Sequence, residues 1–359
     1  MSKHQIASGA DYAPTAETEK VVKPGEFIFA SAFLDHGHIN GQTNGLKDAG
    51  AMLKWAFDPD AERLADFLEK NPEAQAAESY EQILNDPEVK LICSAAVPSE
   101  RARIGFQALE AGKDYFTDKS PFTTLEQLEQ ARELVAKTGK KYMVYYSERL
   151  HNEGGMAAGK LIDEGAIGKV LQVINLAPHR LSKSIRPDWF FDKEKYGGIL
   201  TDIGSHQFEQ FLHYTKAKDA TINFARVENF NNPDQPGLED FGEASLTAEN
   251  GASFYCRLDW FTPDGSASWG DGRTFVVGTE GTMEVRKYMD VAREAPASKI
   301  FLVNGTEERE IQCLENTGFP FFGDLILDCI NRTEYAMTQA HAFKAAELSL
   351  KAQALADVA

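Results

Sequence analysis

The sequence lacks any long hydrophobic run, and it is poor in cysteine. Its longest apolar stretch, about Phe27 to Leu34, is far shorter than the roughly 20 residues that a membrane-spanning helix needs. The four cysteines are scattered without a Cys-x-x-Cys pair, which indicates free thiols in a reducing compartment rather than a disulfide framework or a zinc site. These absences predict a cytoplasmic protein without a membrane partner.

Positive charge is scarce as well. The chain has 37 lysines and arginines against 55 aspartates and glutamates, a formal net charge of −18. A chain this acidic repels phosphate backbones, so no nucleic-acid partner is expected. Hydrophobic residues make up 43% of the 359 residues, which is ordinary for a globular protein of two domains. Residues 1–25 have no apolar signal-peptide segment and are predicted to form a polar N-terminal arm.

Short apolar runs alternate with amphipathic stretches over residues 26–147. The amphipathic stretches predict helices over Ala61–Lys70, Ser99–Ala111 and Leu125–Thr138. This alternation is typical of βαβ units, and it predicts a doubly wound, Rossmann-type parallel sheet that binds ligands at the carboxyl ends of its strands. The predicted strands are Phe27–Leu34, Met52–Phe57, Val89–Val97, Asp114–Thr117 and Tyr142–Tyr146.

The alternation of apolar runs with amphipathic stretches ends at about Ser147. Residues 148–359 begin with a helix, a strand and a second helix over Thr201–Tyr214, and continue with strands that follow one another without helices. Consecutive strands joined by tight turns predict an α+β domain with a large, mainly antiparallel sheet. Its predicted role is substrate binding and oligomerisation, and the two helices that close the chain can pack back on the first domain. The predicted fold class is therefore α/β, with a parallel-sheet domain followed by an α+β domain.

The turn after the first predicted strand has an unusual composition. A dinucleotide-binding fold places Gly-x-Gly-x-x-Gly here, so that backbone amides receive the pyrophosphate. This chain has Phe33, Asp35 and His38 in the three glycine positions. Two interpretations stay open: a cofactor-binding turn in which Asp35 pairs with His36 or His38, and a capped turn without a ligand.

Two carboxylates follow later predicted strands. Asp58 lies about 20 residues beyond the turn. An acid at this spacing holds the adenosine ribose of a dinucleotide and favours NAD over NADP. Alternatively, Asp58 caps the helix that follows. Asp118 precedes Lys119 at the end of the strand Asp114–Thr117, where the lysine could donate to a substrate oxygen. The alternative is a surface turn.

The segment Gly197 to His206 reads GGILTDIGSH. It places Asp202 and His206 four positions apart, on one face of a predicted helix. The two glycines permit close approach by another backbone or by a ligand. A histidine near its ordinary pKa can take a proton from an alcohol at neutral pH, with the aspartate orienting the substrate. A structural pair is the alternative, and no metal site is predicted because no third ligand follows at a recognisable spacing.

Taken in order, these motifs resemble the Gfo/Idh/MocA family of NAD(P)-dependent sugar and cyclitol oxidoreductases, over roughly Phe27 to the C-terminus. Asp118 and Lys119 match the family's Glu-Lys-Pro motif, with Ser120 in place of the proline. The GGILTDIGSH segment matches its Gly-Gly-x-x-x-Asp-x-Gly-x-His motif. Further family-like segments are residues 58–60, 80–89, 108–113 and 340–348.

The resemblance implies hydride transfer between NAD (NADP being the less favoured cofactor) and a secondary hydroxyl or ketone of a sugar, a sugar derivative or a cyclitol. It implies that Lys119 hydrogen-bonds the substrate oxygen, that His206 is the general acid/base and that Asp202 positions the hydroxyl. A homodimer or homotetramer is also implied. The cofactor-binding residues are then Leu34, Asp35, His36, Gly37, His38, Asp58, Ala96, Pro98 and Asp118, and the substrate-binding candidates are Arg149, His179, Arg186 and Trp189, with Arg180 nearby.

Two other functions stay open. The missing glycines favour a catalytically idle relative that binds a nucleotide or a sugar as a sensor, whereas the set of Lys119, Asp202 and His206 favours an enzyme. The third function is that of an NAD-dependent glycosidase, which would hold NAD tightly and show no net turnover of it.

Overall fold

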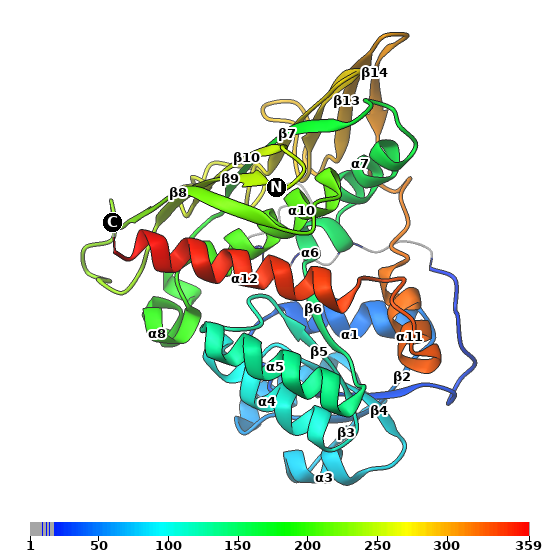
Figure 1. The fold of residues 1–359 in the computed structure, drawn as a ribbon. Coiled ribbons are helices and arrows are strands. Elements are labelled where there is room, and N and C mark those ends of the chain that lie inside the picture. The colour runs from blue at the N-terminus through cyan, green and yellow to red at the C-terminus, as the bar shows by residue number, and fades with distance from the viewer. Residues whose placement is uncertain (1–8, 10–11, 13, 15–17, 359) are drawn as a thin grey trace. The chain divides into compact units, whose positions relative to one another are not determined.

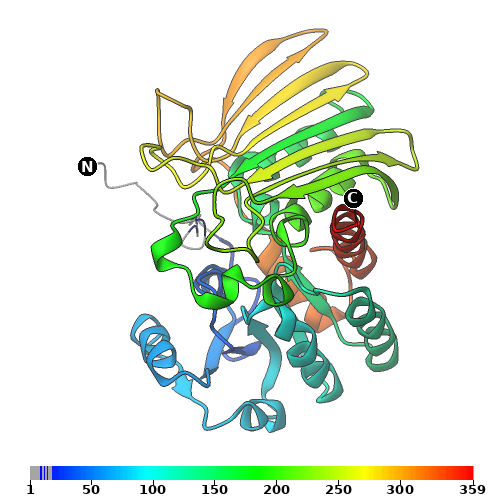
Figure 2. The same ribbon diagram turned by 90° about the vertical axis from the view of Figure 1, so that its left-hand side faces the viewer.

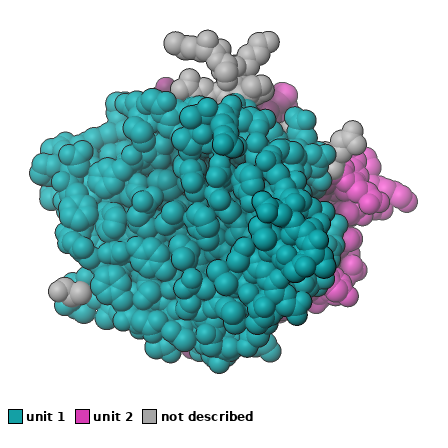
Figure 3. Space-filling view, turned by 90° about the horizontal axis from the view of Figure 1, so that it is seen from above, with its two compact units in different colours: residues 1–12, 146–319, 344–359 teal, residues 13–145, 320–343 magenta. Residues whose placement is uncertain are grey.

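The computed structural model describes residues 9, 12, 14 and 18–358, and the chain divides into two compact units (Figure 3). Unit 1 comprises the described residues within 1–12, 146–319 and 344–359, and unit 2 comprises those within 13–145 and 320–343. The chain passes from unit 2 to unit 1 between Tyr145 and Tyr146. Much of the predicted arm over residues 1–25 lies outside the described residues.

Unit 2 is built on a six-stranded parallel sheet, in the order β3-β2-β1-β4-β5-β6. This confirms the predicted Rossmann-type sheet. The strand order reverses between β1 and β4, and the turns after these two strands lie where open α/β sheets bind ligands. The strands are β1 (Ile28–Ala32), β2 (Met52–Phe57), β3 (Gln75–Ala76), β4 (Val89–Ser94), β5 (Asp114–Asp118) and β6 (Tyr142–Tyr145).

The helices of unit 2 begin at local capping signals. The Asp60 side chain accepts hydrogen bonds from the amides of Glu62 and Arg63, and Thr124 forms a capping box with Gln127. Helices α2 and α5 have the predicted bounds, whereas α1 was not predicted because its buried face carries several polar residues and glycines. The helices are α1 (His38–Asp48), α2 (Ala61–Lys70), α3 (Tyr80–Asn85), α4 (Pro98–Glu110), α5 (Leu125–Thr138) and α11 (Phe321–Asn331).

Unit 1 is built on an eight-stranded sheet in the order β14-β13-β12-β11-β7-β10-β9-β8, which forms one broad layer (Figure 2). The pairing is antiparallel except between β7 and β10, so the predicted large, mainly antiparallel sheet is confirmed. The strands are β7 (Val170–Pro178), β8 (Ala220–Glu228), β9 (Phe241–Ala248), β10 (Ser253–Asp259), β11 (Arg273–Gly278), β12 (Gly281–Arg286), β13 (Lys299–Asn304) and β14 (Glu308–Gln312).

The two faces of this sheet differ in burial. Helices α7 (Glu153–Asp163) and α10 (Gly204–Thr215) lie on one face (Figure 1). The strand register places a row of buried residues there and a row of partly exposed residues, several of them aromatic, on the opposite face. The buried row includes Ala244, Cys256, Asn175, Thr274 and Val285, and the opposite row includes Ser245, Tyr255, Ile174, Phe275 and Glu284.

The remaining helices of unit 1 are mostly short. The helix predicted over Thr201–Tyr214 begins earlier than expected and divides at Ile203, which keeps helical dihedral angles. No helix in the described part of the chain has both the length and the apolar character to cross a membrane. The short helices are α6 (Ser147–Leu150), α8 (Lys193–Tyr196), α9 (Ile199–Asp202) and the 3₁₀ helices Lys183–Ile185 and Asp188–Phe191. Helix α12 (Gln339–Ala356) is long, and its first five residues belong to unit 2.

Candidate active site

The turn between β1 and α1 replaces a glycine with an aromatic residue. Phe33 has a φ of 58°, in the left-handed region that a glycine adopts without steric cost. Its amide donates to the Phe57 carbonyl at 2.9 Å, and its carbonyl accepts from Ala95 at 3.1 Å. Its ring packs edge-on against Phe57 and Tyr80, with centroid distances of 5.5 and 5.0 Å. Neighbouring strands and aromatic rings therefore hold the turn in the glycine-like conformation.

The backbone amides of this turn are engaged within the protein. Leu34 donates to Asp58 Oδ2 at 2.6 Å, and His36 donates to the Ala95 carbonyl at 2.9 Å. The amide of His38 donates to His36 Nδ1 at 3.2 Å, and the next two amides close tight turns onto the carbonyls of His36 and Gly37. The amide cradle that the glycine fingerprint offers to a pyrophosphate is therefore largely committed to protein acceptors.

Asp58 is buried and already fully hydrogen-bonded. Arg63 donates to it through Nε at 3.1 Å and through Nη2 at 2.9 Å, and the Asp60 amide donates to Oδ1 at 2.8 Å. The N-cap of α2 is Asp60, so the alternative reading of Asp58 as the cap is wrong. Arg63 also lies 3.2 Å from Asp35, whose pKa is raised by burial and by Asp58 although Arg63 lowers it. A ribose hydroxyl at Asp58 would compete with Arg63.

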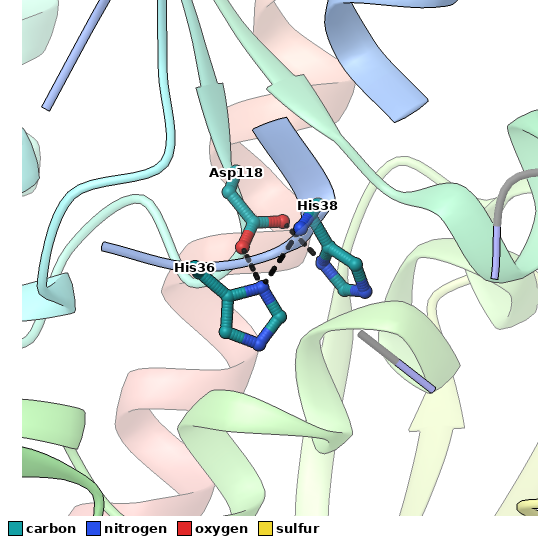
Figure 4. Close-up of side chains that lie close together, drawn as sticks. All are labelled: His36, His38 and Asp118. Atoms are coloured by element: carbon teal, nitrogen blue, oxygen red, sulfur yellow. Dashed lines mark hydrogen bonds and ion pairs between the residues drawn. The ribbon is translucent and has the colours of Figure 1, made fainter. Parts of the chain in front are cut away.

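Three side chains converge at the ends of β1 and β5 (Figure 4). His38 Nδ1 lies 2.9 Å from Asp118 Oδ1, and His36 Nδ1 lies 3.4 Å from Asp118 Oδ2. Arg101 donates to Asp118 Oδ2 at 3.1 Å. Burial by itself would raise the pKa of Asp118, but His38 and Arg101 hold that pKa well below its ordinary range. Burial and the neighbouring His38 hold the pKa of His36 well below its usual value.

Lys119 follows Asp118 directly, and the peptide bond between Lys119 and Ser120 is cis. The Lys119 side chain is largely buried. The Ala96 carbonyl accepts from Arg101 Nε at 2.7 Å, and Pro98 is the first residue of α4. All nine predicted cofactor residues therefore follow or end the strands β1, β2, β4 and β5, at the carboxyl edge of the sheet in unit 2.

In unit 1, a glycine at position 198, the second of the pair before Asp202, is required by a side chain from α12. Gly198 has a φ of 90°, and a Cβ at this position would lie 2.2 Å from Gln353 Cδ. Gln353 Oε1 accepts from the Leu200 amide at 3.0 Å, and its Nε2 donates to Glu239, which in turn accepts from the Ile199 amide at 2.8 Å. The first amides of α9 therefore bind side chains of the protein. The close approach that the glycines allow is to Gln353.

Asp202 ends α9 and His206 lies in the first turn of α10. His206 is buried, and its ring packs edge-on against Tyr146 at a centroid distance of 6.3 Å. The Asp202 amide donates to the Gly198 carbonyl at 2.8 Å, so the position of the aspartate depends on the glycine turn. The structure therefore keeps Asp202 and His206 in consecutive helical turns, as the spacing predicts.

A buried polar network that was not predicted lies beside His206. Glu148 Oε2 accepts from Gln207 at 2.8 Å and from Lys287 Nζ at 3.3 Å, and Lys287 also donates to Gln210 at 2.6 Å. Burial raises the pKa of Glu148, but attraction from Lys287 and His206 outweighs burial and holds it well below its ordinary value. Burial lowers the pKa of Lys287. The network keeps a carboxylate near His206.

The substrate-binding candidates fall into two groups. Arg149 is buried and donates to Glu209 through Nε at 2.9 Å and through Nη2. Arg186 donates to the carbonyls of Leu181 and Arg180 and stacks on Phe190 at 4.5 Å. Both guanidinium groups therefore donate to acceptors within the protein, and their substrate-binding role stays a prediction. Arg180 also donates to backbone carbonyls, those of Pro263, Ser266 and Ser268.

The second group consists of His179 and Trp189. His179 Nδ1 pairs with the Ala177 carbonyl at 3.1 Å, and Nε2 lies 3.4 Å from Glu148 Oε1. Its ring lies between two tryptophans, Trp260 and Trp269. Trp189 is partly exposed on a 3₁₀ helix. His179 therefore joins the Glu148 network, which was not predicted; the available signal was a carboxylate two residues after the apolar run that ends at Tyr146.

The geometry defines a chain of dinucleotide-binding topology joined to an α+β unit. Two family models match it: "Oxidoreductase family, NAD-binding Rossmann fold" over residues 35–146, and "GFO/IDH/MocA C-terminal domain" over residues 156–284. The chain is also 44% identical to a protein of known crystal structure from Erwinia carotovora atroseptica SCRI1043, with a TM-score of 0.90 and coverage of 92% of this chain and 99% of that one. The chain belongs to the Gfo/Idh/MocA family of oxidoreductases.

Two curated relatives match over shorter stretches. The D-xylose dehydrogenase of Paenarthrobacter nicotinovorans is 32% identical over 152 residues, and the scyllo-inositol 2-dehydrogenase (NADP(+)) of Bacillus subtilis (strain 168) is 27% identical over 187 residues. These stretches cover 40% and 50% of this chain and 38% and 51% of the two relatives. The chain therefore matches about half or less of the length of each.

Proposed function

We propose that the protein is a dehydrogenase that transfers hydride between NAD and a secondary hydroxyl of a sugar, a sugar derivative or a cyclitol. The observation that carries the proposal is the glycine turn that leads Asp202 and His206 into consecutive helical turns of an oxidoreductase-family chain. The names of the two curated relatives, a xylose and an inositol dehydrogenase, support this substrate class.

Each of four side chains has a separate task in this proposal. NAD, when bound, accepts hydride from the carbinol carbon at C4 of its nicotinamide. His206 takes the hydroxyl proton during oxidation and returns it during reduction, so the carbinol loses one hydride and one proton and becomes a carbonyl. Asp202 orients the hydroxyl, and the family resemblance assigns Lys119 a hydrogen bond to the substrate oxygen. Glu148, ionised beside His206, stabilises the protonated imidazole.

The residues of unit 2 fit the ends of a dinucleotide better than its centre. At the adenosine end, Asp35, Asp58 and Asp60 surround Arg63, so carboxylates outnumber the guanidinium. A 2′-phosphate would bring further negative charge to this cluster, and we therefore propose NAD in preference to NADP. Towards the nicotinamide end we place Lys119, which follows β5, whereas His36 and His38 belong to the β1–α1 turn between the two ends. The turn between the ends has few amides left for the pyrophosphate.

The test begins with calorimetric titrations of NAD and NADP into the full chain. We expect NAD to bind at least about tenfold more tightly, a difference of about 1.4 kcal/mol. A panel of sugars and cyclitols is then screened for NADH formation by absorbance. No binding of either dinucleotide at millimolar concentration would overturn the proposal.

The catalytic assignment is tested with His206→Ala. Removal of a general base lowers kcat by roughly 10²–10⁴-fold, and NAD affinity should remain because the proposed cofactor residues belong to unit 2. His213→Ala, on the same helix, is the matched control and should keep wild-type turnover. Unchanged turnover in His206→Ala would remove this residue from the mechanism.

A second function has one observation in its favour. Because the amides of the β1–α1 turn are engaged, a protein that binds a sugar or nucleotide without turning it over would have the same turn. Such a sensor would bind a sugar or a nucleotide in calorimetry and form no NADH with any member of the panel. Turnover that depends on His206 excludes it.

A further inference from the structure

His36, His38 and Asp118 bring three ligand atoms together at the carboxyl edge of unit 2. One ring nitrogen from each histidine and one carboxylate oxygen of Asp118 lie within 4.8 Å of one another, and Figure 4 shows the three side chains side by side. We propose that these three side chains bind a divalent transition-metal ion of the Zn²⁺ type. The sequence pattern predicted no metal site, because the two histidines are separated from Asp118 by most of the parallel sheet's sequence.

The donor set and its spacing suit such an ion. Two imidazole nitrogens and one carboxylate oxygen are common ligands of Zn²⁺ and of related first-row ions, and three protein ligands leave positions for an exogenous group. Ligand atoms about 2.1 Å from an ion, at tetrahedral or octahedral angles, are separated by about 3.0–3.4 Å. His38 Nδ1 lies 2.9 Å from Asp118 Oδ1, and His36 Nδ1 lies 3.4 Å from the second carboxylate oxygen, Oδ2. To bind among these atoms, an ion has to displace the hydrogen bond that the His38 amide donates to His36 Nδ1 at 3.2 Å.

The cluster is held in place by outer contacts. Arg101 donates to Asp118 Oδ2 at 3.1 Å, to the Ala96 carbonyl at 2.7 Å and to the Ser120 carbonyl at 3.1 Å. Asp118 Oδ1 is thereby directed at His38, and the hydrogen bond from the His36 amide to the Ala95 carbonyl ties the first histidine to the end of β4. Outer partners of this kind orient the ligands of metal sites.

The cluster is also accessible. The side chains of His36 and His38 are 16% and 10% exposed, whereas that of Asp118 is 1% exposed. The carboxylate therefore lies at the bottom of the site, and the imidazoles form its outer part. The competing state is a proton shared between His38 and Asp118, which an ion has to displace.

The charges around the cluster indicate what the ion would do. Arg101 is paired with Asp118, and the charge of Lys119 also acts on His36, so Arg101, Lys119 and Asp118 together carry a net positive charge without an ion. A dication adds two positive charges beside the turn whose amides are engaged. If the proposed NAD function holds, on which this step rests, the ion's open positions accept oxygens of the dinucleotide pyrophosphate and take the place of the glycine cradle.

Metal binding is tested without a cofactor. The full chain, freed of tag and stripped with a chelator, is titrated with Co²⁺ and followed by visible absorption, and with Zn²⁺ by calorimetry. We expect one ion per chain and a Co²⁺ spectrum of mixed nitrogen and oxygen ligation. His38→Ala should weaken binding by tenfold or more, and His341→Ala, a histidine of α12 outside the cluster, should bind like the wild type.

Asp118→Asn leaves the buried Arg101 without its charge partner, and we expect this variant to unfold more easily. The decisive test of the metal site is therefore the double variant His36→Ala/His38→Ala. Circular dichroism checks that the double variant is folded. Absence of saturable Co²⁺ and Zn²⁺ uptake by the wild type would overturn the proposal. So would equal uptake by a folded double variant.

The link to the dinucleotide is tested separately. NAD is titrated into the chain with Zn²⁺ and with chelator, and we expect Zn²⁺ to raise NAD affinity by about tenfold, with NAD raising Zn²⁺ affinity by the same factor. Equal NAD affinity in both conditions would overturn the bridging step. Zn²⁺ binding without NAD binding in either condition would overturn the proposed dehydrogenase and support the metal site.

Discussion

At the scale of single residues, the buried pair of Glu148 and Lys287 gives the clearest electrostatic expectation. Glu148 is held ionised by Lys287, His206 and His179, although burial opposes it, and its pKa lies well below the ordinary value of 4.5. A carboxyl group whose pKa falls on folding contributes stability above its unfolded pKa. That contribution is lost as the pH falls from about 4.5 through the folded value.

We predict that Glu148→Gln lowers the free energy of unfolding by about 3–5 kcal/mol at neutral pH, because it leaves the Lys287 ammonium buried without its charge partner. The double variant Glu148→Gln/Lys287→Met should recover most of this loss, since no buried charge remains at the pair. Chemical unfolding followed by fluorescence measures both variants. A single variant as stable as the wild type would contradict the assignment of a charge pair.

The pH dependence follows from the same pair. Thermal unfolding between about pH 7 and pH 3 should show a larger loss of Tm for the wild type than for the double variant, because the wild type alone has to protonate Glu148. Glu164→Gln, at an exposed residue, is the control and should follow the wild type. Parallel curves for the wild type and the double variant would show that Glu148 has no depressed pKa.

At the scale of elements, the turn into α9 couples α12 to the candidate catalytic residues. Gly198 combines a φ of 90° with direct contact to Gln353, whereas Gly251 has a φ of 88° and no atom within 4 Å of its Cβ position. The two glycines therefore share the backbone conformation and differ in the close contact.

We predict that Gly251→Ala lowers the free energy of unfolding by about 1 kcal/mol, because of the left-handed backbone conformation alone. Gly198→Ala should lower it by at least about 2 kcal/mol more. Gly198→Ala should also lower kcat, because the Asp202 amide is bonded to the Gly198 carbonyl. Denaturant unfolding and steady-state kinetics measure the two effects. The double variant Gly198→Ala/Gln353→Ala should recover part of the difference, and equal costs for the two single variants would show that the Gln353 contact is unimportant.

Element positions were largely predictable because they depend on local sequence. Helices α2 and α5 have the predicted bounds, and each begins at a capping residue that is readable in the sequence. Helix α1 was missed because it buries Gln42 and Thr43, so its apolar period is weak. Strand β3 was missed because it has only two residues, both exposed.

At the scale of the whole molecule, the face of the large sheet opposite α7 and α10 carries a row of partly exposed apolar side chains. Ile174, Tyr255 and Phe275 are neighbours across β7, β10 and β11, and Phe224 and Phe301 continue the row to either side. Apolar patches of this extent commonly mark contacts between proteins. The row is consistent with the homodimer or homotetramer that the family resemblance implies.

We predict that light scattering after size exclusion gives a dimer or tetramer for the wild type and a smaller species for Phe275→Glu, because the carboxylate would be buried at the interface. Tyr335→Glu is the control, since Tyr335 is 81% exposed and belongs to unit 2. A monomeric wild type, or a Phe275→Glu variant of unchanged mass, would contradict the assigned face.

The sequence by itself determined the fold class of both parts of the chain, because apolar periodicity and turn residues act over a few neighbouring positions. It also placed the candidate cofactor residues at one edge of the parallel sheet, since parallel strands end on the same side. It could not show that Arg63 donates hydrogen bonds to the Asp58 carboxylate or that Arg149 is paired with Glu209. Nor could it show that the Asp118 carboxylate lies beside two histidine rings. Only the tertiary structure decided these pairings, because strand register and loop paths determine which distant side chains meet, and charged groups removed from water must find partners there.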